Sequence, residues 1–222
     1  MKKISIIIPA YNEEKYIIKT IESFYKNEIS FELIVICDSC EDKTNEIAKK
    51  YTENVFEVNF QNVSKTRNFG FNKSSGDIVV FNDADTIVSN NYLQEIINSI
   101  NKYDYGCANW VSESDTFWGK YVAVASSNYN KKHIGGNFFI KKELFNSVNG
   151  FNEKMIKGED TDLGDRLRKV NKKHCFLKNC WIIPSERKYK EQGYLRLILK
   201  SGFEGFLYKF FRNYYNKTIA KI

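Results

Sequence analysis

Short apolar runs alternate with amphipathic segments through roughly the first hundred residues. Apolar runs of about four to eight residues are typical of buried strands, whereas apolar side chains at every third or fourth position predict helices. The predicted strands span 3–9, 31–37, 55–59 and 77–82. The predicted helices span 12–25, 42–51, 64–73 and 91–101, with Asp42 and Ser64 as candidate N-caps. This alternation predicts an α/β fold with a Rossmann-like, mainly parallel sheet and helices on both faces.

The pattern is less regular after Gly106. Strands are predicted over 107–111, 137–140 and 174–183, and helices over 141–149 and 159–170. The polar and aromatic stretch 112–136 gives no clear assignment. We therefore expect one domain over 1–185, with a regular half (1–105) and an irregular half (106–185), followed by a tail over 186–222.

The charge of the chain is concentrated in that tail. The whole chain carries a net charge of +7, and residues 186–222 contain nine Lys or Arg against three Glu, a net +6. A nearly neutral body is a poor fit to a nucleic-acid-binding protein. A basic, aromatic tail suits an anionic membrane surface, and it equally suits a solvated helix packed on the domain. One helical face of the tail carries Leu195, Leu199, Phe203, Phe206, Phe210 and Tyr214, a stripe that also fits a core or dimer contact.

The ends of the chain and its cysteines predict a cytoplasmic protein. No apolar run approaches the length of a membrane span, and Met1-Lys2-Lys3 leads directly into a strand rather than into a signal peptide. The count of five cysteines is odd, with one close pair, which argues against a disulfide framework and fits reduced thiols.

Two carboxylates follow the strand predicted at 77–82, in the triplet Asp83-Ala84-Asp85. Side chains alternate along a strand, so the two carboxylates point the same way. Open α/β sheets bind ligands at such strand ends, and paired oxygen ligands there suit Mg²⁺ or Mn²⁺ with a phosphate ester. An ordinary Asp-rich turn is the alternative interpretation.

Polar loops at neighbouring strand ends strengthen the first interpretation. Residues 9–14 place aromatic, amide and carboxylate groups at a predicted helix start. Asp38 in the next loop offers an acceptor for the N–H groups of a uracil or guanine. Residues 64–70 place cations, including Arg67, at another helix start suited to a pyrophosphate.

The order and spacing of these motifs resemble family 2 glycosyltransferases with a GT-A fold. The resemblance rests on Pro9-Ala10-Tyr11-Asn12-Glu13-Glu14, Asp38 with Asp42-x-Thr44, Arg67-Asn68-x-Gly70, Asp83-Ala84-Asp85, Lys141-Lys142-Glu143-Leu144-Phe145, Gly150-Phe151-Asn152-Glu153 and the acidic stretch 158–167. It covers about Lys3 to Val170 and identifies 1–105 as the nucleotide-sugar half and 106–185 as the acceptor half.

The resemblance implies a role for each matching residue. The nucleotide-sugar-binding residues would be Pro9, Tyr11, Glu13, Asp38, Arg67, Asp83 and Ala84. Asp85 would bind Mn²⁺ or Mg²⁺, and Asp160 would be the catalytic base. Acceptor-binding candidates are Trp110, Trp118 and Glu159, with Tyr121 as a further ring for sugar stacking.

The resemblance implies an inverting transfer of a sugar from a UDP- or GDP-sugar to a hydroxyl acceptor, a glycan or a lipid-linked glycan, by single displacement. A cytoplasmic enzyme with peripheral contact to an anionic membrane is the matching expectation. Two departures concern the end of the domain. No His follows Ile183 as a metal ligand, so the metal would keep more water, or Ser185 or Glu186 would approach it. The Gln-x-x-Arg-Trp motif of processive synthases is absent, which favours single addition.

Two other functions remain as alternatives. Cys37-x-x-Cys40, between a strand and a helix, is compatible with a thiol-disulfide oxidoreductase. It leaves Asp83, Asp85 and Asp160 without a role. A non-catalytic protein that binds nucleotide sugars is the other alternative, although it would not need the acidic residues.

Overall fold

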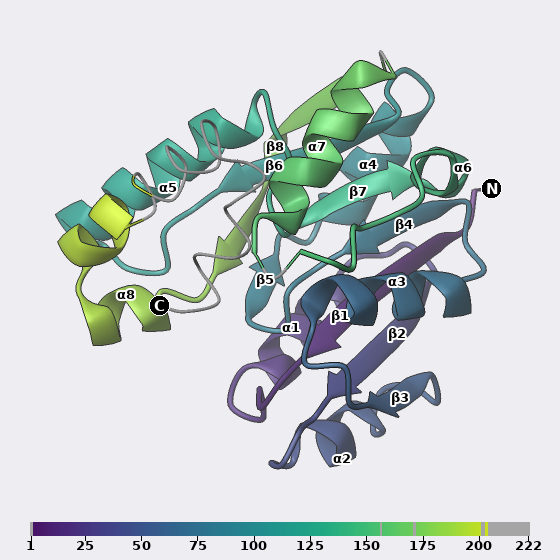
Figure 1. Ribbon diagram of the computed structural model, residues 1–222, viewed down its shortest axis with the longest axis horizontal. Helices are drawn as coiled ribbons and strands as arrows, with labels where there is room; N and C mark the ends of the chain where they lie inside the picture. Colours follow the sequence, from purple (N-terminus) through teal and green to yellow (C-terminus); the bar gives the residue numbers. More distant parts are fainter. Residues whose placement is uncertain (1, 156, 171, 201–202, 204–222) are drawn as a thin grey trace.

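The computed structural model in Figure 1 describes residues 2–155, 157–170, 172–200 and 203. Its strands are β1 (Ile4–Ala10), β2 (Phe31–Asp38), β3 (Val55–Val58), β4 (Ile78–Phe81), β5 (Thr86–Val88), β6 (Tyr105–Trp110), β7 (Phe138–Lys141) and β8 (His174–Pro184). Its helices are α1 (Ile17–Tyr25), α2 (Thr44–Ala48), α3 (Val63–Lys73), α4 (Tyr92–Ile100), α5 (Phe117–Asn130), α6 (Lys142–Ser147), α7 (Glu159–Lys169) and α8 (Arg187–Gln192). In the described part of the chain, no helix is long and apolar enough to cross a bilayer.

The described strands form one eight-stranded sheet in the order β3-β2-β1-β4-β7-β6-β8-β5. β1 pairs in parallel with β2 and β4, and β2 pairs in parallel with β3. Beyond β4 the sheet is mixed, because β7 runs antiparallel to β4 and β6, β6 runs parallel to β8, and β5 runs antiparallel to β8. The predicted α/β fold with a mainly parallel sheet is confirmed.

Helices cover both faces of the sheet (Figure 1), and an apolar core lies between the helices and each face. α1 and α4 contribute Phe24 and Ile96 to one core. α3, α6 and α7 contribute Phe71, Phe145 and Leu167 to the other. With both faces covered by helices, the carboxyl ends of the parallel strands are the place where a ligand can reach the sheet.

Three predicted helix starts are displaced in the structure. α1 begins at Ile17 rather than at residue 12, because turns and irregular backbone occupy residues 11–16. α2 and α3 begin after Lys43 and Asn62, so neither predicted cap is the N-cap residue. The Asp42 carboxylate still accepts from the Thr44 amide, the first of α2, at 3.0 Å, whereas Ser64 lies inside α3. The Asn62 side chain caps α3 by accepting from the Lys65 amide at 3.0 Å.

The unassigned stretch 112–136 contains α5, the 14-residue helix on the left of Figure 1. The Thr116 hydroxyl caps it by accepting from the Gly119 amide at 3.1 Å. Its apolar residues occupy both sides of the helix, since Val122 is buried while Phe117 and Val124 are exposed. A helix that is apolar on both sides has little amphipathic pattern, which is why the sequence did not predict it.

The predicted helical tail lies partly within the described residues. α8 and residues 194–200 are helical, and Gly193 separates them with a φ of 86° that favours glycine. The stripe residues Leu195, Leu199 and Phe203 are exposed. The other predicted stripe residues Phe206, Phe210 and Tyr214 lie outside the described residues.

Candidate active site

A cavity of about 570 Å³, the edge cavity, opens at the carboxyl ends of β1, β2 and β4. Its lining residues are Pro9, Ala10, Tyr11, Glu13, Asp38, Gln61, Asn62, Val63, Thr66, Asp83, Ala84, Asp85, Arg187 and Lys188. The structure thus brings together all the residues predicted for the nucleotide sugar and the metal except Arg67. Because these parallel strands end at one edge of the sheet, residues far apart in sequence line the same cavity.

The loop after β2 braces the loop after β1. The Thr44 hydroxyl accepts from the Glu13 amide at 2.7 Å, and Asp42 accepts from the Glu14 amide at 3.0 Å. Thr44 in turn donates its hydroxyl to Asp42 at 2.5 Å. The Asp42-x-Thr44 motif therefore fixes the backbone that carries Glu13 into the cavity.

Asp38 is an internal acceptor at the end of β2. Its carboxylate accepts from the amides of Phe60, Gln61 and Asn62 at 2.8, 2.9 and 3.2 Å and from the Thr66 hydroxyl at 2.6 Å. Burial by itself would raise the pKa of Asp38, but these hydrogen bonds outweigh it and lower the pKa. The predicted base-binding carboxylate lines the cavity, yet most of its acceptor capacity is spent on the loop that leads into α3.

Left-handed backbone recurs in the loops of this cavity. Asn12, Ser39 and Gln61 have φ values of 54°, 58° and 48°, and they follow β1, follow β2 and precede α3 respectively. Non-glycine residues seldom adopt this conformation, and such residues cluster at functional sites. Asn12 holds its neighbour loop by accepting from the Glu41 amide at 2.8 Å.

Arg67 lies buried between two carboxylates. Its guanidinium donates to Asp83 Oδ1 at 2.8 Å and to Glu159 Oε1 at 2.9 Å, and it packs 5.3 Å from the centre of the Phe151 ring. Only 4 % of the side chain is exposed, and a buried charge needs such partners. Arg67 does not line the edge cavity, and its expected role at the nucleotide phosphates stays a prediction. Its guanidinium ties the end of β4 to the start of α7.

The neighbouring Asn68 extends this tie to the loop before α7. Its side-chain amide donates to the Phe151 carbonyl at 2.9 Å, and its side-chain oxygen accepts from the Phe151 amide at 2.9 Å. The two residues of the Arg67-Asn68 motif therefore join the two halves of the domain, and neither lines the edge cavity.

Two cations line the cavity, Arg187 at the start of α8 and Lys188 next to it. The Arg187 guanidinium donates to both carboxylate oxygens of Glu13, at 2.6 Å for Oε2, and lies 3.4 Å from Asp85 Oδ2. Glu13 and Arg187 are 174 positions apart, and no motif flagged Arg187 in the sequence. Glu13, which was expected to bind the ribose, is engaged by this cation.

Asp85 sits at the inner wall of the edge cavity. Burial and the charge of Asp83 raise its pKa to about 6, and Arg187 opposes that shift. Its backbone carbonyl accepts from the Ser185 amide at 3.0 Å. The carboxylate faces Arg187 and the cavity, which leaves acceptor capacity for a ligand.

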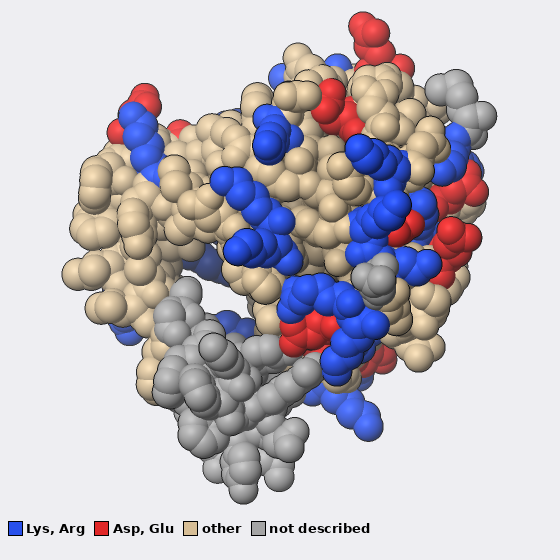
Figure 2. All heavy atoms as spheres, turned by 90° about the horizontal axis from the view of Figure 1, so that it is seen from above, with Lys and Arg blue, Asp and Glu red and all other residues tan. Residues whose placement is uncertain are grey.

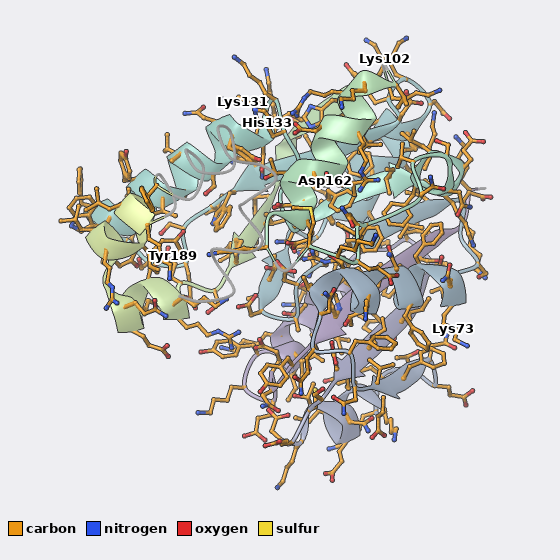
Figure 3. The ribbon with its side chains drawn as sticks, in the orientation of Figure 1. Lys73, Lys102, Lys131, His133, Asp162 and Tyr189 are labelled. Carbon is orange, nitrogen blue, oxygen red and sulfur yellow. The ribbon has the colours of Figure 1, made fainter. Side chains whose placement is uncertain are left out.

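A second cavity of about 360 Å³, the aromatic cavity, contains Asp160. It is lined by Trp110, Tyr121, Val122, Ala125, Ser126, Tyr129, Asn130, Gly135, Gly136, Asp160, Tyr189 and Ile198. Figure 3 shows Tyr189 rising from α8 toward α5. Burial and the adjacent Glu159 raise the pKa of Asp160 to about 6, while Arg67 opposes the shift. Such a pKa suits a carboxylate that accepts a proton near neutral pH.

The two cavities adjoin at Gly136. A Cβ atom on Gly136 would lie 2.9 Å from Asp83 Oδ2 and 3.2 Å from Arg67 Nη2, so only glycine fits here without displacing the pair. Asn137 next to it accepts from the Asp83 amide at 2.7 Å. Asp83, which lines the edge cavity, thus lies directly against Gly136, which lines the aromatic cavity.

The predicted acceptor-binding residues are divided by the structure. Trp110 and Tyr121 line the aromatic cavity with Asp160. Glu159 is paired with Arg67, and Trp118 lies outside the cavity lining, 41 % exposed on α5. Tyr129 and Tyr189 were missed, because neither α5 nor the position of α8 was predictable.

The donor set fits a divalent cation that is shared with a diphosphate. Within the described ranges, no group of three or more His, Cys, Asp or Glu is placed to hold a metal ion alone. Mg²⁺ is usually bound by one or two carboxylates, with phosphate oxygens and water completing its shell, and Asp85 can supply one of these. Glu186 is not available, because its carboxylate accepts from Ser112, Ser114 and Tyr194.

Comparison with known families decides the identity of the fold. The model described as glycosyl transferase family 2 matches residues 5–152, about two thirds of the chain. The chain belongs to glycosyl transferase family 2. A second model, described as the N-terminal domain of galactosyltransferase, matches residues 120–189, from α5 to the start of α8.

Relatives of this family 2 chain are longer proteins. Glycosyltransferase GlyA of Streptococcus pneumoniae is 30% identical over 141 residues, which cover 59% of this chain and 20% of GlyA. The poly(ribitol-phosphate) beta-N-acetylglucosaminyltransferase TarS of Staphylococcus aureus is 30% identical over 112 residues, 46% of this chain and 20% of TarS. The chain spans about a fifth of the length of these curated relatives.

Solved structures share the GT-A fold of family 2. TarS residues 1–349 with UDP-GlcNAc superpose with a TM-score of 0.67 at 20% identity, over 83% of this chain and 59% of that one. The mannosyltransferase PcManGT of Pyrobaculum calidifontis with GDP-Man and Mn²⁺ gives 0.66 at 18% identity, over 81% and 56%. At this identity the likeness establishes the fold.

The cysteine pair does not resemble a reactive dithiol in this family 2 domain. Cys37 is 2 % exposed, and its hydrogen bond with Cys40 together with burial raises the pKa of its thiol. Reactive cysteines are exposed and have lowered pKa values. Cys40 donates to the Ala10 carbonyl at 3.4 Å and packs under the first loop. The hydrogen bond with Cys37 lowers the pKa of the Cys40 thiol, so the argument against the oxidoreductase alternative rests on the burial and raised pKa of Cys37.

Proposed function

We propose that this domain transfers a sugar from a nucleoside diphosphate sugar, a UDP-sugar in the first place, to a hydroxyl group of a glycan or lipid-linked glycan, with inversion. One observation carries the proposal. Two carboxylates whose pKa values are raised to about 6, Asp85 and Asp160, occupy two cavities that adjoin at Gly136. One cavity is polar and charged, and the other is rich in aromatic rings.

The edge cavity suits the donor. Pro9, Ala10 and Tyr11 offer a surface for the base, and Gln61 and Asn62 offer polar groups beside it. Asp85 would hold Mn²⁺ or Mg²⁺, which when bound would neutralise charge on the diphosphate. Arg187 and Lys188 add positive charge at the same end of the cavity.

The aromatic cavity suits the acceptor. Trp110, Tyr121, Tyr129 and Tyr189 offer ring faces on which the apolar faces of a sugar can pack. Asp160 would take the proton of the acceptor hydroxyl as its oxygen bonds to the anomeric carbon. The bond from that carbon to the diphosphate breaks, and the electron pair leaves with the diphosphate. A single displacement of this kind inverts the anomeric centre.

The similarity to TarS supports a UDP-sugar as the donor, and the similarity to PcManGT keeps a GDP-sugar as the alternative. TarS binds UDP-GlcNAc, whereas PcManGT binds GDP-Man with Mn²⁺. The test is calorimetric titration of UDP and GDP, and of their sugars, with Mn²⁺ and with EDTA. We expect UDP to bind with at least about tenfold higher affinity in Mn²⁺. Equal affinity in EDTA would remove the metal from the proposal.

The tail and α5 support a membrane-bound acceptor. Figure 2 shows the lobe around α5 as largely uncharged on the face in view. Phe117 on α5 and Leu199 after α8 are 74 % and 66 % exposed, and Lys188 and Arg196 lie in the described part of the basic tail. Apolar groups beside basic residues suit an anionic lipid surface, where a lipid-linked acceptor would be found.

A further inference from the structure

Arg187 faces the carboxylate that would bind the metal. It is the first residue of α8, directly after the loop that follows β8. Its two terminal nitrogens hold the Glu13 carboxylate, its guanidinium stacks 4.7 Å from the centre of the Tyr16 ring, and its Nη2 lies 3.4 Å from Asp85 Oδ2. A quarter of its side chain remains exposed, at the wall of the edge cavity.

The contact with Asp85 is the looser of the two. The Glu13 contact is bidentate, with one bond at 2.6 Å, whereas the Asp85 contact is a single approach at 3.4 Å. Bidentate arginine–carboxylate pairs are the stronger kind. Glu13 and Tyr16 therefore keep the guanidinium near the cavity, while its approach to Asp85 can change when a ligand arrives.

A divalent cation at Asp85 would lie within a few ångströms of this guanidinium. Like charges at such a distance repel, so Arg187 opposes the binding of the cation while no donor is present. A diphosphate reverses the balance, because its oxygens accept from the guanidinium and also complete the metal shell. Arg187 thus favours metal binding only when the diphosphate of the donor is bound as well.

We propose that Arg187 is a positioning residue that couples metal binding to donor binding. Without donor it stands beside Asp85 and weakens the site for the free cation. With donor it turns toward the diphosphate, held by Glu13, and leaves Asp85 to the metal. This inference rests on the proposed function, because it requires a diphosphate in the edge cavity.

The experiment measures two affinities in Arg187→Gln, which removes the charge and keeps a polar side chain. Free Mn²⁺ is titrated by electron paramagnetic resonance without nucleotide, and UDP is titrated by calorimetry in saturating Mn²⁺. We expect Arg187→Gln to bind Mn²⁺ alone roughly tenfold more tightly and UDP roughly tenfold more weakly. Arg187→Lys should lie between the variant and the original protein in both measurements.

The matched control is Lys190→Gln, which removes one charge from the same helix. Lys190 pairs with Glu113 at 2.8 Å and does not line the edge cavity, so both affinities should change by less than about threefold. Thermal unfolding of each variant confirms that it is folded.

Opposite signs of the two shifts are the mark of coupling, because a residue needed only for structure would weaken both. Unchanged or weaker Mn²⁺ binding in Arg187→Gln overturns the inference, and so does unchanged UDP binding. If the original protein binds no UDP in Mn²⁺, the proposed function fails. The titration with Mn²⁺ alone still tests whether Arg187 opposes the cation.

Discussion

At the end of β2, Asp38 accepts hydrogen bonds from three backbone amides and a hydroxyl, and Asp42 accepts from Glu14 and Thr44. At the centre of the site, Asp85 and Asp160 are half-buried and have fewer donors: Arg187 approaches Asp85 at 3.4 Å, and the Thr161 amide donates to Asp160 at 2.7 Å. Burial acts on all four carboxylates. Hydrogen bonds outweigh it at Asp38 and Asp42 and lower their pKa values, whereas at Asp85 and Asp160 the pKa is raised to about 6.

This difference separates carboxylates that hold the loops of the site in place from carboxylates that can still accept a proton or bind a metal ion. A satisfied carboxylate stabilises the loops around it and has little capacity left for a ligand. A half-buried carboxylate with few hydrogen bonds costs stability when charged, and a metal ion or a proton relieves that cost. Sequence motifs do not distinguish the two kinds, since both follow strands in the same sheet.

The largest expected effect is on turnover in Asp160→Asn. An amide cannot accept the acceptor proton, so we expect kcat to fall on the order of 10²- to 10⁴-fold. UDP affinity in Mn²⁺ should stay within about twofold, because the base acts in the transition state. Initial rates at saturating donor and acceptor, with calorimetry for UDP, make the measurement.

The control for this variant is Asp115→Asn, which changes a carboxylate on the fully exposed surface before α5. It should keep normal turnover. Near-normal kcat in Asp160→Asn would show that Asp160 is not the base. The raised pKa of this carboxylate would then have no link to catalysis.

A smaller effect is expected on stability in Asp38→Asn. The amide would turn N–H groups toward the donors that the carboxylate now accepts from, leaving part of them unpaired. We expect the free energy of unfolding to fall by about 2–3 kcal/mol. Urea denaturation at pH 7 measures it. A variant as stable as the original protein would show that Asp38 is not the internal acceptor that its contacts indicate.

The same Asp-to-Asn substitution at Asp160 should change the free energy of unfolding in the opposite direction. The folded-state pKa of Asp160, about 6, lies above its ordinary value of 3.8, so its contribution to stability is present below about pH 4 and is lost as pH rises through 6. Asp160→Asn has no carboxyl group to ionise, so it does not lose this stability as the pH rises. At pH 8 we expect the variant to be more stable by on the order of 1–3 kcal/mol, and at pH 4 nearly equal to the original.

Urea denaturation at a series of pH values from 4 to about 8 tests this sign. A stability difference that does not change with pH, or a variant that is less stable at pH 8, would contradict the raised pKa. Together with Asp38→Asn, the series shows whether the two kinds of carboxylate differ as proposed.

The smallest expected effect concerns the surface outside both cavities. Basic residues near an anionic leaflet contribute about 1 kcal/mol each, and salt screens them. We expect sedimentation with anionic vesicles at low salt and release at high salt. Removal of residues 195–222 should abolish binding, and Phe117→Ser should weaken it. A protein that stays in the supernatant at low salt would show that the tail and α5 do not meet lipid.

The sequence by itself determined the parallel sheet and the edge at which ligands bind. Apolar strands that alternate with helices leave few arrangements, and parallel strands bring their carboxyl ends together. Asp38, Asp83 and Asp85 could therefore be assigned to one cavity, and Asp160 to the start of a later helix, before any coordinates.

Only the tertiary structure decided which partner each charge has. Arg67 faces Asp83 and Glu159 rather than the cavity, and Arg187 reaches Glu13 across 174 positions, because helices on the folded sheet bring distant segments together. The same holds for the aromatic cavity, which depends on α5. That helix has apolar residues on two sides, so its sequence does not show the period of an amphipathic helix. Partner choice depends on where side chains meet in space, and neither motif spacing nor local periodicity records it.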